Sequence, residues 1–170
     1  SNIAKKLSSL QTEEARFSAT GTGIFGGQQS SQMNFIESES PEILDKSKTA
    51  FHCKDFLYMK LTNVRATDPS EACMTFGNFR TRNYDNEVIK NIGLDNRKYL
   101  FPNIVDGSKI TYPLSENAAK ATGLKEGTPV SLAYLDGLCS FLGSGGYDSN
   151  KKVGNTVIGT TGIHMKTSEV

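Results

Sequence analysis

An almost unbroken apolar run, Pro129 to Leu135 (PVSLAYL), ends directly before Asp136. Of all the features of the sequence, this run constrains the fold most. A short apolar run of this kind is typical of a strand that is covered on both faces. Helical spacing resumes after it, with Leu138, Phe141 and Leu142 on one face. The order strand, carboxylate, helix predicts an α/β chain with Asp136 at the sheet edge where such proteins bind ligands.

Two interpretations of Asp136 are open from the residue alone. A carboxylate beside a buried strand costs free energy unless it is solvated or used, and Gly137 leaves room for a ligand next to it. The alternative is a helix cap, since Asp is a preferred N-cap residue, and the local pattern favours this alternative. The two roles are compatible, because a capping carboxylate is held rigidly.

Local signals along the rest of the chain also predict a mixture of helices and strands. Ser40-Pro41 and Asp68-Pro69 each combine a capping residue with a proline in the first helical turn. Near the end of the chain, residues 152–158 and 163–167 alternate as strands do and flank the short segment 159–162. This arrangement predicts a β-hairpin.

Two glycine-rich segments are candidate ligand sites. The hairpin turn Gly159-Thr160-Thr161-Gly162 offers backbone N–H groups and hydroxyls to a phosphate, although these residues are also ordinary in turns. The loop 21–32 lacks the lysine of a Walker motif. Its Gln28 and Gln29 carry uncharged donors and acceptors that suit hydroxyl groups, and a plain surface loop is an equally good interpretation.

Charge and apolar patterning argue against several partners. The 170 residues include 19 basic and 18 acidic side chains, mixed throughout, for a formal charge of +1. Without a basic stripe the chain is not expected to bind nucleic acid. No apolar run approaches the roughly 20 residues that cross a bilayer, so no membrane partner is expected.

Cysteine and histidine usage adds two expectations. Cys53, Cys73 and Cys139 are odd in number and lie beside apolar residues, which predicts reduced thiols in a cytoplasmic protein. The only histidines, His52 and His164, stand in no metal-ligand spacing, so no protein metal site is predicted. His52 is expected to be a packing or surface residue.

Five segments, taken in order, resemble the FGGY carbohydrate kinases along nearly the whole chain. The segment 52–62 is similar to a K-D-Y-L-x-x-x-L-T-G helix, and 67–72 to a T-D-x-S-x-A segment. The segment 80–85 resembles a stretch with a basic residue before an aromatic-aspartate pair. The segment 122–130 is similar to G-L-x-x-G-T-P-V, and 159–162 to a G-T-S-G hairpin.

The resemblance implies a ribonuclease H-like (actin-like ATPase) core, present in part, with helices packed on a short mixed sheet. Residues 1–144 are then expected to be the latter part of the N-terminal, sugar-binding domain. Residues 145–170 are expected to be the opening β-hairpin of the C-terminal, nucleotide-binding domain. The D-x-G-T phosphate loop and the C-terminal adenosine site of the family are absent from the sequence, so the chain is expected to be an internal piece.

The resemblance also implies the chemistry. It identifies Asp136 as the general base, places Gln28 and Gln29 in a sugar-contacting segment, and places residues 159–162 at the γ-phosphate of ATP, with Mg²⁺ as the second cofactor. Where the family usually has G-x-x-D-N-x-A, this chain has bulkier apolar residues around Asp136. L-xylulose kinase-like and polyol kinase-like members tolerate such variation, so a pentulose or a short polyol is the expected substrate.

Two alternatives to an active kinase belong to other functional classes. The chain by itself is expected to be catalytically inert if only part of a cleft is present, since alignment of two substrates supplies much of the rate. A non-catalytic sugar-binding module on the same scaffold is the third reading. Apolar faces left uncovered would favour association of the chain into a homodimer.

Overall fold

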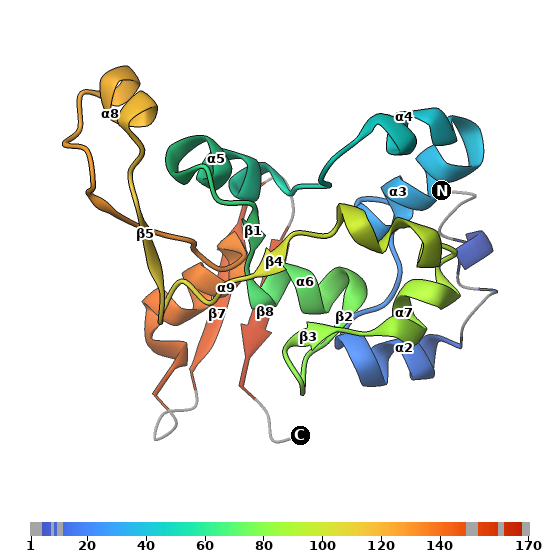
Figure 1. Cartoon of the computed structure of the whole chain (residues 1–170). Helices are drawn as coiled ribbons and strands as arrows, with labels where there is room; N and C mark the ends of the chain where they lie inside the picture. The colour runs from blue at the N-terminus through green and yellow to red at the C-terminus, as the bar shows by residue number, and fades with distance from the viewer. Residues whose placement is uncertain (1–4, 8, 10–11, 149–152, 160–161, 168–170) are drawn as a thin grey trace. The chain divides into compact units, whose positions relative to one another are not determined.

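The computed structural model describes residues 5–7, 9, 12–148, 153–159 and 162–167 (Figure 1). The chain divides into two compact units, Ser1–Leu132 and Ala133–Val170. Within the described part of the chain, no helix is long and apolar enough to span a membrane.

In its described residues the first unit is mainly helical and holds three two-stranded sheets. Its α-helices are α2 (Glu13–Thr20), α3 (Gln29–Glu39), α4 (Pro41–Lys46), α5 (Cys53–Thr62), α6 (Pro69–Phe76), α7 (Asn86–Asn91) and α8 (Glu116–Thr122). Its sheets are the parallel pair β1 (Ala66–Thr67) and β4 (Asn103–Ile104), and the antiparallel pairs β2 (Gly77–Asn78) with β3 (Asn83–Tyr84) and β5 (Thr111–Pro113) with β6 (Pro129–Ser131). A 3-10 helix, Asp95–Leu100, follows α7.

The described residues of the second unit form an α-helix, a π-helical turn and a hairpin. These elements are α9 (Asp136–Phe141), the π-helical turn (Leu142–Gly146), β7 (Gly154–Ile158) and β8 (Gly162–Lys166). The two strands pair antiparallel, with Ile158 opposite Gly162 at the turn end. The predicted β-hairpin is therefore confirmed.

Capping residues explain where several helices begin and end. Asp68 caps α6 by accepting a hydrogen bond from the Ser70 N–H at 2.7 Å, as the sequence predicts. Helix α5 ends at Asn63, whose φ of 63° is left-handed. Asparagine adopts this conformation more readily than most residues, which explains how it replaces the glycine of the K-D-Y-L-x-x-x-L-T-G pattern.

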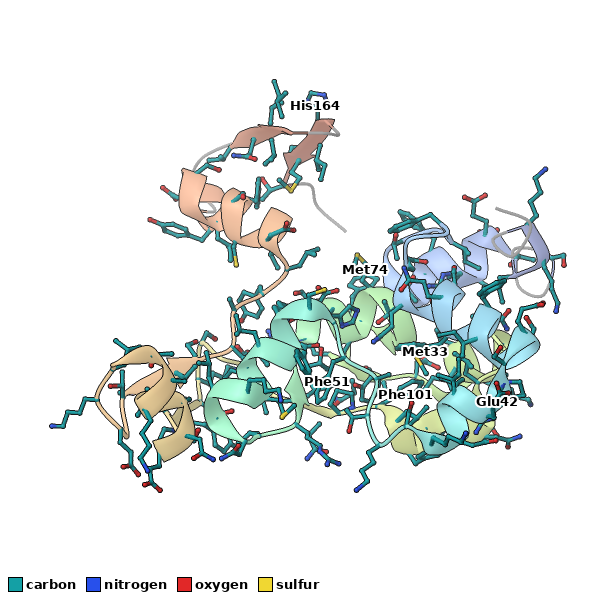
Figure 2. All side chains as sticks on the ribbon, turned by 90° about the horizontal axis from the view of Figure 1, so that it is seen from above. Met33, Glu42, Phe51, Met74, Phe101 and His164 are labelled. Atoms are coloured by element: carbon teal, nitrogen blue, oxygen red, sulfur yellow. The ribbon has the colours of Figure 1, made fainter. Side chains whose placement is uncertain are left out.

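The larger core of the first unit lies among α3, α6, α7 and the 3-10 helix. Phe76 stacks on Phe101 with ring centroids 4.3 Å apart. Met33, Ile89 and Leu100 are buried in the same cluster, and Figure 2 shows Met33 and Phe101 projecting into this interior. A second cluster, with Tyr58 and Leu132 at its centre, lies under α5 and β6.

The prediction of one long buried strand over residues 129–135 is wrong. The strand ends at Ser131, and both Pro129 and Ser131 are exposed. Val130 between them is half-buried, so β6 has one covered face and not two. Leu132, 3% exposed, is the residue of the run that enters the core.

Candidate active site

Asp136 is the first residue of α9, and its side chain is exposed to solvent. Its Oδ1 accepts a hydrogen bond from the Gly137 N–H at 2.7 Å. The N-cap position falls one residue earlier, on Leu135, whose hydrocarbon side chain has no oxygen for capping. Asp136 therefore occupies the first turn, where a negative charge is favourable near the helix N-terminus.

Space is open beside this carboxylate. If Gly137 carried a Cβ, no described atom beyond the neighbouring residues and the backbone of the helix itself would lie within 4 Å of it. The side chain of Asp136 thus stands in solvent with room for another group next to it.

The hairpin turn belongs to the same compact unit as Asp136. Helix α9 contacts strand β7, which leads into the turn. A Cβ on Gly159 or on Gly162 would likewise meet no described atom within 4 Å. The backbone at both glycines is therefore accessible to a ligand, whereas Thr160 and Thr161 lie outside the described residues.

Gln28 and Gln29 lie in the first unit and have different environments. Gln28 is 3% exposed, and its Oε1 lies 3.4 Å from the Phe25 N–H donor and 3.5 Å from Arg16 Nη2. Its amide thus turns inward and holds the loop before α3. Gln29 is half-buried and lines a cavity of about 10 Å³ together with His52, a volume close to that of a single water site.

A buried cluster of charged residues was not foreseen from the sequence. It joins the first turn of α5 to the first turn of α6. Lys54 Nζ lies 2.8 Å from Asp55 Oδ1 and 2.6 Å from Asp68 Oδ1. His52 bridges two carboxylates, with Nδ1 3.2 Å from Asp55 Oδ2 and Nε2 3.3 Å from Glu71 Oε2.

The pKa values in this cluster follow from burial and from the paired charges. Burial by itself would raise the pKa of Asp55, but hydrogen bonds with His52 and Lys54 outweigh it and lower that pKa. Burial raises the pKa of Glu71 despite the nearby positive groups. Burial by itself would lower the pKa of Lys54, but hydrogen bonds with Asp55 and Asp68 outweigh it and raise that pKa.

The sequence carried a partial signal for this cluster. His52 was expected to be a packing or surface residue, and the segment 67–72 was explained by helix capping alone. The two segments each hold charged residues at a predicted helix start, but only convergence of α5 and α6 brings them together. The cluster links these two helix starts, since Lys54 pairs with Asp68 and His52 pairs with Glu71 across the two segments.

The comparison with protein families decides the relationship. Residues 1–143 match the model of the N-terminal domain of the FGGY family of carbohydrate kinases. The chain belongs to the FGGY family of carbohydrate kinases. The resemblance seen in the sequence is thereby confirmed.

Named relatives in the FGGY family cover most of the chain. An erythritol kinase of Brucella abortus is 51% identical over 165 residues, which make up 97% of this chain and 32% of that protein. A xylulose kinase of Bacillus subtilis is 27% identical over 139 residues, 81% of this chain and 27% of that protein. The chain spans about a third or less of the length of these relatives.

Solved structures confirm the fold class. The crystal structure of a xylulose kinase from Rhodospirillum rubrum matches with a TM-score of 0.76 at 21% identity, over 85% of this chain and 30% of that one. At this identity the likeness concerns the fold, which is the actin-like ATPase fold of FGGY sugar kinases. The chain carries part of that fold. Its strands are short, and helices make up about half of its described residues.

Proposed function

We propose that this chain is part of an ATP-dependent kinase that phosphorylates a hydroxyl of a short polyol of the erythritol type, with Asp136 as the general base. The observation that carries the proposal is the exposed Asp136 carboxylate with open space at Gly137 beside it. The 51% identity to an erythritol kinase supports a polyol, whereas identity to the xylulose kinase is 27%. A pentulose is the second candidate substrate.

In the proposed reaction the Asp136 carboxylate accepts the proton of the substrate hydroxyl as its oxygen becomes the nucleophile. ATP, when bound, supplies the phosphoryl group that this oxygen receives. The Asp136 side chain is exposed to solvent, so water solvates its carboxylate and no buried partner is needed. Gly137 admits the substrate next to it because glycine has no side chain.

The residues of the hairpin fit a phosphate group. Gly159 and Gly162 would lie against the nucleotide phosphates, because their backbone is open to close approach. The assignment of Thr160 and Thr161 to the same role remains a prediction. Mg²⁺ is proposed to bind with the nucleotide phosphates, the usual mode for this ion.

The inward position of Gln28 favours a supporting role over direct contact with the sugar. Its Oε1 already accepts from the loop backbone and from Arg16. Gln29, which is half-buried, is the better candidate for a substrate contact. We further propose residues 1–144 as the latter part of the sugar-binding domain, 145–170 as the opening of the nucleotide-binding domain, and the cytoplasm as the compartment.

A chimera tests the proposal directly. The chain replaces the matching segment of the erythritol kinase of Brucella abortus, and ADP release is measured with erythritol, xylulose and glycerol. We expect turnover that depends on erythritol. Turnover with xylulose alone would overturn the polyol assignment, and a folded chimera without turnover on any of these would overturn the kinase role.

The base is tested in the same chimera. Asp136→Asn is expected to lower kcat by about 10²–10⁴-fold while the binding of erythritol persists. Ser140→Ala, on an exposed position of the same helix, is the matched control and is expected to keep kcat. Near-normal turnover of Asp136→Asn would remove Asp136 from the mechanism.

The isolated 170-residue chain serves as a further comparison. We expect it to release no ADP with any of these substrates, because half of a cleft does not align two reactants. Substrate-dependent ADP release by the chain alone would contradict this expectation.

A further inference from the structure

An open groove of about 600 Å³ runs beside α5 in the first unit. Small-molecule sites are typically about 300–1,000 Å³, so the groove has the capacity for one such ligand. Its apolar surface comes from Phe51, Phe56 and Met59. Phe51 lies where the chain enters α5 (Figure 2), and its ring centroid is 6.4 Å from that of Phe56.

The aromatic surface is accessible. Phe56 is 49% exposed, although it is a large apolar side chain on a helix. Exposed apolar surface that is gathered in a concave place, with polar groups at its rim, is a common mark of a binding site. A single exposed phenylalanine would not indicate a binding site, but here two aromatic rings and a thioether line one groove.

The charged side chains that line the groove are cations. Lys48 and Arg65 line it, and Lys60 Nζ stands 5.3 Å from the centroid of the Phe56 ring. Among the described residues, none of these three cations forms an ion pair with a carboxylate. No Asp or Glu is among the described lining residues. The groove therefore offers positive charge that no carboxylate of the described residues pairs with.

We propose that this groove binds a small organic anion that carries a planar ring. The ring would lie against Phe56 and Phe51, where it removes apolar surface from water. The anionic group would lie between Lys48 and Arg65, where it meets the uncompensated cations. A bare polyol suits the groove poorly because the surface is mostly apolar, so the site is distinct from the substrate site proposed above.

Paired probes test the charge requirement on the 170-residue chain. Binding of AMP and of 1-naphthalenesulfonate is measured by titration calorimetry against their uncharged counterparts, adenosine and 1-naphthalenemethanol. We expect saturable binding of at least one anion, and binding of its uncharged counterpart weaker by about 10-fold or more. The two anions separate a nucleotide ligand from other aromatic anions. Equal binding of charged and uncharged probes, or no saturable binding of either anion, would overturn the proposal.

Variants locate the binding to the groove. Arg65→Ala combined with Lys48→Ala is expected to weaken anion binding by about 10-fold, and Phe56→Ala is expected to weaken both members of a pair. Lys120→Ala removes an exposed cation on α8 and is expected to change nothing. Thermal unfolding confirms that each variant is folded. Unchanged affinity in the folded Arg65→Ala, Lys48→Ala variant would contradict the site.

Cys53 gives a second readout that does not depend on affinity. It is a free, exposed cysteine and one of the residues that line the groove, whereas Cys73 is buried. A bound anion is expected to slow the alkylation of Cys53 by iodoacetamide at saturating ligand. An alkylation rate that stays the same in the presence of a saturating anion would place the anion elsewhere and overturn the proposal.

Discussion

Lys54 Nζ lies 2.6 Å from Oδ1 of Asp68, the residue that caps α6. The other oxygen of the same carboxylate accepts the capping hydrogen bond from the Ser70 N–H at 2.7 Å. One carboxylate therefore both starts a helix and holds the cation of a neighbouring helix.

Removal of the cation is expected to destabilise the fold. Lys54→Met leaves two fully buried carboxylates, Asp55 and Asp68, without their main positive partner. Breaking a buried pair costs about 3–5 kcal/mol, and because the Lys54 side chain is 25% exposed we expect about 2–3 kcal/mol. Urea unfolding at pH 7 measures the change.

A surface pair provides the control for this variant. Lys120→Met removes the exposed partner of Glu116 and is expected to cost less than about 1 kcal/mol. If both variants lose the same free energy of unfolding, the buried cluster has no special role in stability.

The same cluster predicts a pH dependence. Because the pKa of Asp55 is lowered by folding, its contribution to stability is full above the unfolded value of about 3.9 and is lost as the pH falls through the folded pKa. Asp55→Asn should therefore flatten the fall in the free energy of unfolding below about pH 4. Urea unfolding between pH 3 and pH 7 tests this.

Glu71 is expected to act with the opposite sign. Its pKa is raised, so the stabilisation of its protonated form is present below about pH 4.3 and is lost as the pH rises through the folded pKa. Glu71→Gln should accordingly weaken the fall in the free energy of unfolding that ionisation of Glu71 causes as the pH rises toward neutral. If the free energy of unfolding of Asp55→Asn depends on pH in the same way as that of the unmodified chain, Asp55 does not cause the loss of stability in acid.

Gly107 is expected to accept no side chain. A Cβ there would collide with the backbone carbonyl oxygen of Leu132. The neighbouring Ser131 Oγ donates to the Gly107 carbonyl at 2.7 Å, so the two segments cannot easily separate. Gly107→Ala should lower the free energy of unfolding by about 2 kcal/mol or more, as other overpacked sites do.

Gly23→Ala is the matched comparison for this substitution. A Cβ at Gly23 would meet the flexible carboxylate of Glu13 at 3.5 Å, an ordinary contact. Its effect on stability should stay within about 0.5 kcal/mol. A similar loss for both variants in a chemical unfolding experiment would argue against close backbone packing at Gly107.

Arg16 is expected to be dispensable for stability. It is 1% exposed, and among the described residues no carboxylate pairs with it. Its hydrogen bonds to Gln28 and to the Thr75 carbonyl are long, at 3.5 and 3.4 Å. Burial lowers its pKa because the charge is poorly solvated.

Arg16→Met replaces this costly charge by an apolar chain of similar length. Since buried charges are often replaced by apolar groups without loss, the free energy of unfolding should stay equal or rise by about 1 kcal/mol. Thermal unfolding measures the change. Arg97→Met, which removes contacts with Glu37 and Asp45, should instead lower the melting temperature. A large loss in Arg16→Met would show that its hydrogen bonds matter more than its desolvation.

Local chemistry was predictable from the sequence. The capping carboxylate at Asp68, the hairpin at 154–166 and the helix that begins at Asp136 each depend on residues only a few positions apart. Capping and turn formation are local interactions, so neighbouring residues are enough to specify them. The motifs of the FGGY family could be found in the sequence because each of them is also a short run of neighbouring residues.

Only the tertiary structure decided which distant groups meet. The apolar run before Asp136 predicted a strand covered on both faces, but the strand ends at Ser131, and Pro129 and Ser131 leave one of its faces exposed. The sequence likewise held His52 and Glu71 without indicating that 3.3 Å separates their side chains. Strand coverage and ion pairs depend on segments that are remote along the chain, and burial, which sets their energies, exists only after those segments have packed.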